Sequence, residues 1–517
     1  MTEGEQGGAE GDERRPHPFY NWLSLTGLAL AACNVTALAF FVLVGIFARE
    51  SGYGGLTLLP LVGGGLLGLG LALAGFIREQ WRQKHGRHSS FLGSWVLHPL
   101  GFVRGTGLGV ATLGLMIATL ALLVAGASFF ALTEYSESNA FCGQTCHQVM
   151  SPEATVYENS PHSRLACVEC HVGPGTDSYV RAKIGGLRQL WAVATGNIER
   201  PIHTPIRNRR PSREMCESCH TPDRFVGFKT ASHSYYLSGE ESSPVELLML
   251  VNVGGGGSGD TLLKGSGIHY HMLTAQKVEY GARDEQRQDI AWVHVTDQDG
   301  TVREYARKDE PLSDDERSSL EVRTMECVDC HSRPAHRFQS AARSVNEALA
   351  AGAISSEIPR VKEASVRALD GDYATTAAAM EGIGESVRKF YEEEQSEVLE
   401  EQSGEIEKSV ETLKEIYGRT IFPEMSAKWS AHPDNIGHLE SPGCFRCHND
   451  AMVDKNGEAV PTECTRCHAI LAQGDEVIEE SAKLDTGQPF VHPPDSEVME
   501  EFAQCTECHS GGASVYE

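Results

Sequence analysis

The stretch CGQTCHQVMSPEATVYENSPHSRLACVECH, residues 142–171, contains two pairs of cysteines, and each pair is followed directly by a histidine. The second pair has the spacing C-x-x-C-H, and the first has one more residue between its cysteines. Five further C-x-x-C-H segments follow, so that 14 of the 15 cysteines belong to such a motif. Motifs 1–7, in chain order, are Cys142, Cys146 and His147; Cys167, Cys170 and His171; Cys216, Cys219 and His220; Cys327, Cys330 and His331; Cys444, Cys447 and His448; Cys464, Cys467 and His468; and Cys505, Cys508 and His509.

This spacing has a specific chemical use. Two thiols form thioethers with the edge of a porphyrin, while the adjacent imidazole reaches the iron from one face. Structural zinc sites and disulfides also pair cysteines, but neither requires a histidine after every pair. The sequence therefore predicts seven covalently bound haem c groups, held through the fourteen cysteines of the motifs.

The supply of second iron ligands bears on what such haems can do. Seven irons have fourteen axial positions, of which the motif histidines fill seven, and the chain after residue 133 holds ten further histidines and Met150. All seven irons can thus be six-coordinate, which favours electron relay over reduction of a bound small molecule. The predicted second ligands are Met150, His162, His269, His271, His336, His438 and His492; the weaker candidates are His203, His233, His294 and His432.

Three apolar stretches precede the motifs. Residues 22–47, 54–77 and 107–132 contain no charged side chain and no histidine. Each is long enough to cross a hydrocarbon core of about 30 Å as a helix, and the first is too long for the apolar core of a cleaved signal peptide. The sequence predicts three transmembrane helices, and in the second, Gly64 and Gly68 belong to a small face for close helix packing. A b-type haem between these helices is excluded, because they offer no histidine.

The charges divide the chain into two parts. Residues 1–133 contain 8 basic and 7 acidic side chains, against 36 and 64 in the remainder. A net charge of -27 argues against nucleic acid as a partner. Positive residues before the first apolar stretch and between the second and third predict a cytoplasmic amino terminus and a haem domain on the periplasmic face of a bacterial inner membrane. These residues are Arg14, Arg15, Arg78, Arg82, Lys84, Arg87 and Arg104.

The fold class predicted is a membrane-anchored, α-helical multihaem cytochrome c with a mostly α exported domain and a β-rich insert. Runs of β-forming residues over 245–253, 277–280 and 290–295, with the turn Asp299-Gly300, predict the insert. His269 and His271 alternate around Tyr270, so on a strand both would face the same side. An amphipathic helix is expected over 177–199, where Trp191 can meet a membrane surface. The segments are a tail at 1–21, the anchor at 22–133, motifs 1–3 at 134–225, the insert at 226–320, and motifs 4–7 at 321–517 with a helical region at 339–420.

Two groups of motifs carry a family resemblance. Cys142-Gly-Gln-Thr-Cys-His-Gln-Val-Met150, followed by Ser160-Pro-His162 and motif 2, resembles the NapC/NirT family of membrane-anchored multihaem quinol dehydrogenases. Cys327-Val-Asp-Cys-His-Ser-Arg-Pro-Ala-His336, and Asn435-Ile-Gly-His438 with motif 5, look like the seven-haem inner-membrane cytochromes of bacteria that respire extracellular acceptors. The resemblance covers roughly residues 134–517.

The resemblance implies an activity and two site residues. In the family, quinol from the membrane pool is oxidised beside the haem nearest the membrane, and electrons pass to periplasmic c-type cytochromes or a partner reductase. That haem can take methionine as a ligand, which here matches Met150, and whether His147 or Met150 holds the iron is open. Lys183 matches a family lysine that donates a hydrogen bond to the quinone; the alternative is an ordinary solvated helix charge.

Two other functions remain as alternatives to a menaquinol dehydrogenase. One is a terminal reductase of a small oxyanion such as nitrite, which the supply of second ligands and the absence of a C-x-x-C-K motif disfavour. The other is a haem scaffold subunit of a larger respiratory complex.

Overall fold

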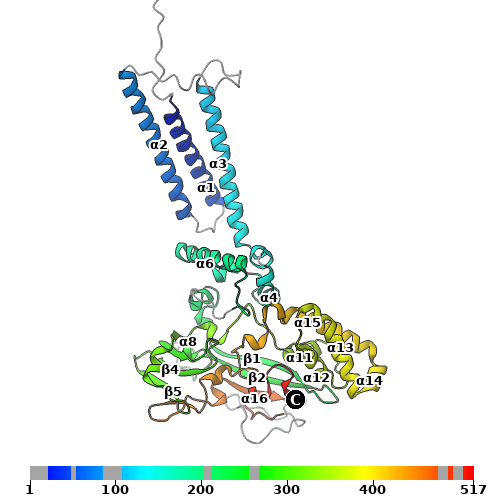
Figure 1. The fold of residues 1–517 in the computed structure, drawn as a ribbon. Coiled ribbons are helices and arrows are strands. Elements are labelled where there is room, and N and C mark those ends of the chain that lie inside the picture. The colour runs from blue at the N-terminus through cyan, green and yellow to red at the C-terminus, as the bar shows by residue number, and fades with distance from the viewer. Residues whose placement is uncertain are drawn as a thin grey trace, which may run out of the picture. The chain divides into compact units, whose positions relative to one another are not determined.

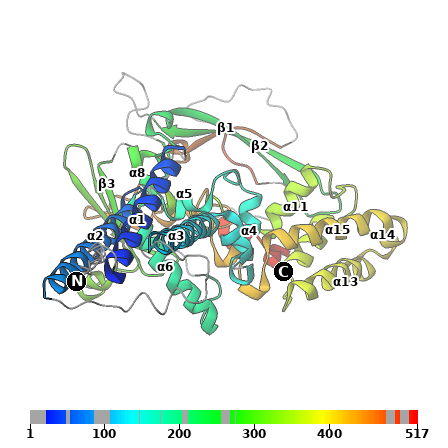
Figure 2. The same cartoon turned by 90° about the horizontal axis from the view of Figure 1, so that it is seen from above.

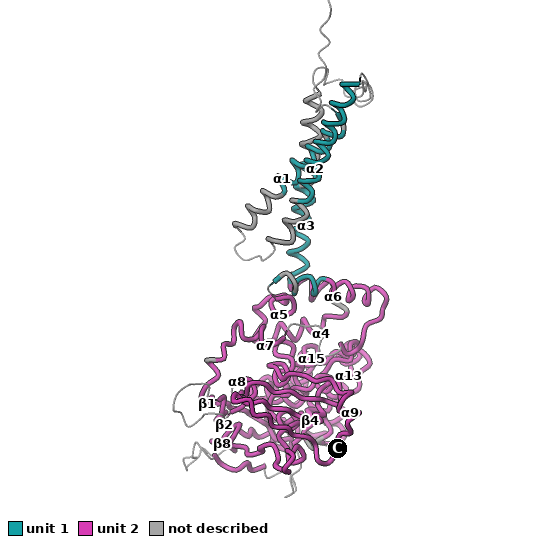
Figure 3. The backbone as a smooth tube through the Cα atoms, turned by 90° about the vertical axis from the view of Figure 1, so that its left-hand side faces the viewer, with its two compact units in different colours: residues 1–138, 174–183 teal, residues 139–173, 184–517 magenta. Residues whose placement is uncertain are grey.

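A computed structural model gives the fold of the chain (Figure 1). It describes residues 21–47, 54–85, 107–145, 147–173, 175–202, 211–254, 267–273, 275–474, 487–492 and 505–516. The chain divides into two compact units, which Figure 3 colours separately. Residues 1–138 and 174–183 form the first, and residues 139–173 and 184–517 form the second. All seven motifs belong to the second unit.

The first unit contains three long helices at the places that the sequence predicts. They are α1 (Trp22–Phe47), α2 (Gly54–Lys84) and α3 (Gly107–Glu137). Among the described residues, Thr119–Glu137 is the helical segment long and apolar enough to cross a membrane, and Thr26–Ala37 is a shorter apolar helix. The three helices are confirmed, while three membrane crossings remain a prediction.

Small residues bring α1 and α2 together. A Cβ atom placed on Gly68 would lie 2.6 Å from the backbone nitrogen of Ala31, so only glycine permits this approach. The Ser24 hydroxyl donates a hydrogen bond of 3.0 Å to the carbonyl of Ala72. On the other side of α1, the Cys33 sulfur lies 3.7 Å from the Thr119 hydroxyl of α3. The small face predicted for the second apolar stretch is thus the surface on which α1 packs.

The main apolar core of the second unit lies in a group of helices that Figures 1 and 2 show at one end, away from β3–β5. Ile406, Val410, Leu413 and Tyr417 are buried in it at helical spacing. Helices occupy most of residues 341–420. Its helices are α11 (Ala341–Ala350), α12 (Val361–Leu369), α13 (Thr376–Glu394), α14 (Ser396–Glu401) and α15 (Ser403–Thr420).

The remaining helices are mostly short and lie at or beside the motifs. The expected amphipathic helix is present as α6, although it ends at residue 195 rather than 199. The α-helices are α4 (His147–Glu158), α5 (Cys167–His171), α6 (Thr176–Thr195), α7 (Ser212–Cys216), α8 (Tyr270–Leu273), α9 (Asp314–Ser319), α10 (Cys327–Cys330) and α16 (Cys505–Cys508). Single turns of other helix types are Phe141–Thr145, Pro222–Arg224, Pro423–Met425, Trp429–Ala431, Gly443–Arg446, Cys464–Arg466 and Ala513–Tyr516.

Two antiparallel sheets form the predicted β-rich region. One has the order β1 (Gly227–Tyr236), β2 (Pro244–Gly254), β8 (His468–Gln473). The other has the order β6 (Val322–Thr324), β3 (Lys277–Ala282), β4 (Ile290–Thr296), β5 (Val302–Arg307), β7 (Met452–Asp454). Thr296 pairs with Val302 across the turn at Asp299-Gly300, which confirms the predicted hairpin. Strands β7 and β8, which follow motifs 5 and 6, complete the sheets; the sequence did not reveal this.

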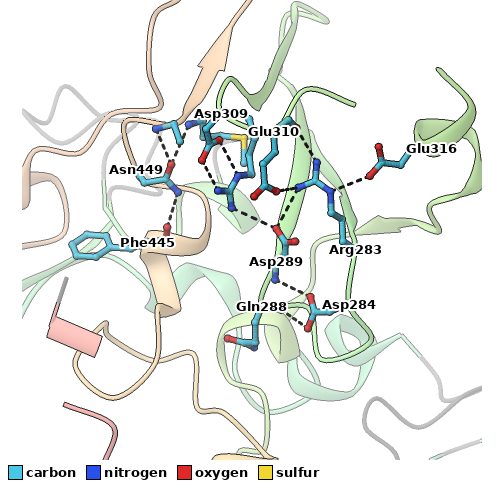
Figure 4. Close-up of polar contacts among 12 residues, drawn as sticks. Arg283, Asp284, Gln288, Asp289, Asp309, Glu310, Glu316, Phe445 and Asn449 are labelled. Carbon is cyan, nitrogen blue, oxygen red and sulfur yellow. Dashed lines mark hydrogen bonds and ion pairs between the residues drawn. The ribbon is translucent and has the colours of Figure 1, made fainter. Parts of the chain in front are cut away.

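Charged side chains fix the β3–β4 connection and the chain after motif 5 (Figure 4). Arg283 bonds to Glu310 at 2.9 Å and to Glu316 at 3.2 Å. The Asp284 carboxylate accepts hydrogen bonds from the backbone N–H groups of Gln288 and Asp289. Asn449, directly after the histidine of motif 5, donates to a carbonyl within the motif and accepts from two backbone N–H groups at the start of β7. Motif 5 is therefore tied directly to the sheet.

A buried network joins motif 4 to motif 5. Asp329, between the cysteines of motif 4, is 5% exposed; it accepts a 2.7 Å hydrogen bond from Tyr280 and forms an ion pair with Arg287. Burial, followed by the nearby Asp329, raises the pKa of Tyr280, so its hydroxyl remains a donor. Arg446, between the cysteines of motif 5, donates to the carbonyls of Asp329 at 2.7 Å, Arg287 at 2.8 Å and Gly443 at 2.8 Å. These contacts fix the two cysteine loops against each other.

The contact between α1 and α2 can be tested by substituting glycine. Gly68→Ala should destabilise the first unit by about 1–3 kcal/mol, because the new methyl group must displace backbone. Gly70→Ala on the same helix is the matched control, since a Cβ there meets no described atom within 4 Å. The measurement is the rate at which a maleimide labels Cys33, which is 1% exposed and lies outside all motifs. Equal labelling rates in the two variants would contradict the packing described.

The joint between motifs 4 and 5 makes a second prediction. Arg446→Gln should lower the free energy of unfolding of the second unit by about 2–3 kcal/mol, because three carbonyls lose a charged donor. Arg466 occupies the same position in motif 6, but its side chain is 50% exposed and hydrogen-bonds to the exposed Glu463 three residues earlier. Arg466→Gln should therefore cost no more than about 1 kcal/mol. The midpoints of thermal unfolding give the comparison, and a larger effect at Arg466 would refute it.

Candidate haem-ligand sites

Five motif histidines each face a second histidine from a distant segment. The distances between ring centres fall in a narrow range, from 5.8 to 6.2 Å. The pairs are His220 with His162 at 6.1 Å, His171 with His336 at 6.2 Å, His448 with His271 at 5.8 Å, His468 with His438 at 6.2 Å, and His509 with His492 at 6.2 Å.

This separation fits one metal ion between two imidazoles. A metal–imidazole nitrogen bond is about 2.0–2.1 Å, and the ring centre lies about 1.1 Å farther on, so two opposite ligands have centres roughly 6.2 Å apart. Every pair joins a motif histidine to one of the predicted second ligands. The donor sets therefore fit the two axial positions of a haem iron.

Hydrogen bonds determine which ring nitrogen carries the proton in several of these histidines. Nδ1 donates to a backbone carbonyl in His336 (2.9 Å, to Glu153), His448 (2.7 Å, to Pro461), His269 (3.0 Å, to Val253), His162 (3.3 Å, to Pro334) and His271 (3.4 Å, to Ile268). A carbonyl can only accept, so the proton is on Nδ1 and the lone pair is on Nε2. This is the tautomer and orientation that a metal-ligating histidine needs.

His269 and His271 serve different motifs. Their alternation around Tyr270 would point both to the same side of a strand, but the chain here turns into α8 instead. Residues two apart on a helix differ by about 200° in direction. His271 consequently pairs with His448 of motif 5, whereas His269 lies near His331 of motif 4.

Burial keeps the imidazoles of His271 and His331 uncharged. Burial, and then the nearby His448, lowers the pKa of His271 to about 4. Burial, and then the nearby His269, lowers the pKa of His331. A neutral imidazole retains the lone pair that a metal requires.

The weaker histidine candidates lie elsewhere. His233 is on β1 beside Tyr235, and Nε2 of His294 lies 3.0 Å from the Glu304 carboxylate. His432 is buried and stacks on Phe338. His203 lies outside the described residues.

Motif 1 is described only in part. Cys142 and Cys167 are hydrogen-bonded through their side chains, so motifs 1 and 2 are neighbours. Cys146, together with the side chain of His147, lies outside the described part of the structure. Met150 is half-buried on α4, one turn after His147. Whether His147 or Met150 ligates the first iron therefore stays open.

The later motifs are also neighbours in series. Cys216 of motif 3 hydrogen-bonds with Cys327 of motif 4. Cys330 of motif 4 lies near Cys444 and Cys447 of motif 5. Cys467 of motif 6 lies near Cys444 of motif 5. The Cys505 sulfur of motif 7 is 3.9 Å from Nδ1 of His438, which is the histidine that faces His468 of motif 6. The side chain of Cys508 is outside the described part.

Lys183 lies at the end of the apolar helix α3. Its ammonium group donates a 2.9 Å hydrogen bond to the Ser136 hydroxyl and lies 3.4 Å from the Glu137 carboxylate. It also sits 5.0 Å from the centre of the Tyr179 ring. Burial, and then Glu137, raises the pKa of Tyr179.

The sequence reasoning missed the charged residues that support the ligands. Arg333 forms a buried ion pair with Glu153, whose backbone carbonyl holds His336. Asp329 and Arg446 join two cysteine loops. Asp329 and Arg446 each lie between the two cysteines of a motif, and this position was the feature that could have pointed to them. The position alone is not sufficient, because Arg466 has it too and is not buried.

Comparison with known proteins identifies the family. Residues 106–208 match the NapC/NirT cytochrome c family, N-terminal region. The cytochrome c-type protein ImcH of Geobacter sulfurreducens is 39% identical over 380 residues, which are 74% of this chain and 73% of that protein. No solved structure matches. The chain therefore belongs to the NapC/NirT family of multihaem c-type cytochromes.

Proposed function

We propose that the protein oxidises menaquinol from the membrane and relays the electrons, through seven covalently bound haem c groups, to a periplasmic or extracellular acceptor. The observation that carries the proposal is the pairing of motif histidines with second histidines at 5.8–6.2 Å. When bound, haem supplies a centre that accepts and gives up one electron at a time.

The histidine pairs support relay over catalysis on a small molecule. His162, His269, His271, His336 and His438, together with His492, would occupy the second axial positions in motifs 2–7. An iron with imidazole on both faces offers no position to an oxyanion. This favours an electron carrier over the terminal reductase considered as the alternative.

The quinol would be oxidised at motif 1. Quinol stays in the bilayer, so its oxidation site must lie at the membrane boundary. Lys183 contacts the last residues of the Thr119–Glu137 segment, which is where a membrane span would end. We assign Lys183 to hydrogen bonding with the quinol and Met150 to ligation of the motif 1 iron. The protons would be released outside the membrane, because the proposed orientation places the haem domain there.

The acceptor would be a basic protein. The residues after 133 carry 36 basic and 64 acidic side chains. A strongly acidic surface attracts a basic partner and speeds its diffusional encounter. A basic periplasmic c-type cytochrome or partner reductase fits this charge, and nucleic acid does not.

Anaerobic mixing of the purified, detergent-solubilised protein with a menaquinol analogue tests the activity. The haem absorbance should change to that of the reduced form, and dithionite should complete the reduction. Denaturing mass spectrometry should show seven haems on the chain. A protein that dithionite reduces but menaquinol leaves oxidised would rule out quinol oxidation.

Removal of one paired histidine tests the ligand assignment. His336→Ala should open one axial position opposite His171, which should convert one haem of seven from low-spin to high-spin in the electron paramagnetic resonance spectrum. His294→Ala is the control, since His294 pairs with Glu304 instead of a motif histidine. Both variants should retain seven covalent haems, because the cysteines are intact. An unchanged low-spin signal in His336→Ala would contradict the assignment.

A further inference from the structure

Helix α6 has an apolar stripe that faces solvent. Val180, Ile184, Leu187 and Trp191 fall within an arc of about 60° when consecutive residues are 100° apart. Leu187 is 66% exposed and Trp191 is 72% exposed, although both are large and apolar. Such a contiguous exposed stripe indicates a surface that another phase or molecule covers.

Little within the described protein stabilises this helix. Gly185 and Gly186 interrupt its middle, and a Cβ built on either meets no described atom within 4 Å. The described contacts hold its beginning, where Lys183 bonds to Ser136 and Glu137 at the end of α3. An isolated helix of this length with two glycines is marginal in water, so its stability calls for contact along the apolar stripe.

The charge of α6 is opposite to that of the chain. Its sequence, TDSYVRAKIGGLRQLWAVAT, contains three basic residues and one acidic residue, whereas the whole chain has a net charge of -27. Arg181 and Arg188 lie along one border of the apolar stripe. A basic border on an exposed apolar stripe with tryptophan is the pattern of a helix that lies in a membrane interface.

We propose that α6 lies flat on an anionic phospholipid bilayer, with its apolar stripe among the upper acyl chains and its arginines on the lipid phosphates. The contact between Lys183 and Ser136 favours a bilayer over a protein partner on this stripe. It joins α6 to the last residues of the Thr119–Glu137 segment, where a membrane span would end. The inference rests on the proposed anchoring of α3 in the membrane, but it does not depend on quinol oxidation. It would hold Lys183, on the same helix, at the depth where quinol leaves the bilayer.

Photo-crosslinking of the full-length protein in lipid nanodiscs tests the inference. A benzophenone amino acid is introduced at Leu187, on the stripe, or at Gln189, which is also exposed but lies on the opposite face. Position 187 should form on the order of tenfold more lipid adduct than position 189, because it faces acyl chains. Leu132, in the apolar part of α3, is the positive control for reconstitution.

The outcomes separate the inference from its alternatives. Low adduct yield at both 187 and 189, with high yield at 132, would refute a membrane-facing stripe. Equal high yields at 187 and 189 would also refute it, since the helix would then be immersed rather than lying on the surface. Adduct yield at 187 should be higher in phosphatidylglycerol than in phosphatidylcholine, and Arg181→Gln with Arg188→Gln should remove this difference. None of these measurements requires menaquinol, so a failure of quinol oxidation leaves them interpretable.

Discussion

The proposed haem sites depend on pairs of imidazoles whose ring centres lie 5.8–6.2 Å apart, a separation that suits a shared iron. In the proposed assembly, each motif supplies one histidine by its covalent spacing, and the second comes from a segment that can be far away in the chain. His271, between β2 and β3, faces His448 of motif 5, and His171 of motif 2 faces His336, which follows motif 4. With haem bound, each pair would therefore act as a crosslink between segments. Because both ligands must meet one iron at a fixed distance, the geometry of each site constrains the chain on both sides.

This constraint explains why the β-rich region is built from separated pieces. Strand β8 begins at the histidine of motif 6, and β7 begins four residues after the histidine of motif 5. His269 and His271 lie between β2 and β3. The sheets therefore bring these two histidines close to motifs 4 and 5, which lie much later in the chain. The buried contacts of Asp329 and Arg446 add a polar joint at the same place. A charged network is suited to this position because its hydrogen bonds are directional and fix one register of the two loops.

The local features of the fold could be predicted from the sequence, because each arises from residues close together in the chain. The three long helices, the helical region with Ile406, Val410, Leu413 and Tyr417, and the hairpin at Asp299-Gly300 all follow from periodicity or turn chemistry. The expectation that His269 and His271 would face the same side on a strand also came from considering only residues close together in the chain. Alternation around Tyr270 suggests a strand, but Gly267, with a φ of 102°, precedes a helical turn that sends the two rings to different motifs.

The sequence by itself determined the haem chemistry, the number of candidate attachment sites, the acidic character of the chain after residue 133 and the positions of the apolar helices. Spacing within a few residues is sufficient for these, because thioether attachment and helix formation are local events. Only the tertiary structure decided which histidine faces which motif, and that His432, His294 and His233 face none of the motif histidines in the described pairs. It also showed that Arg446 is part of a buried joint whereas Arg466, at the same position in its motif, is exposed. Burial and long-range pairing distinguish such residues, and these depend on the packing of distant segments rather than on neighbours in the chain.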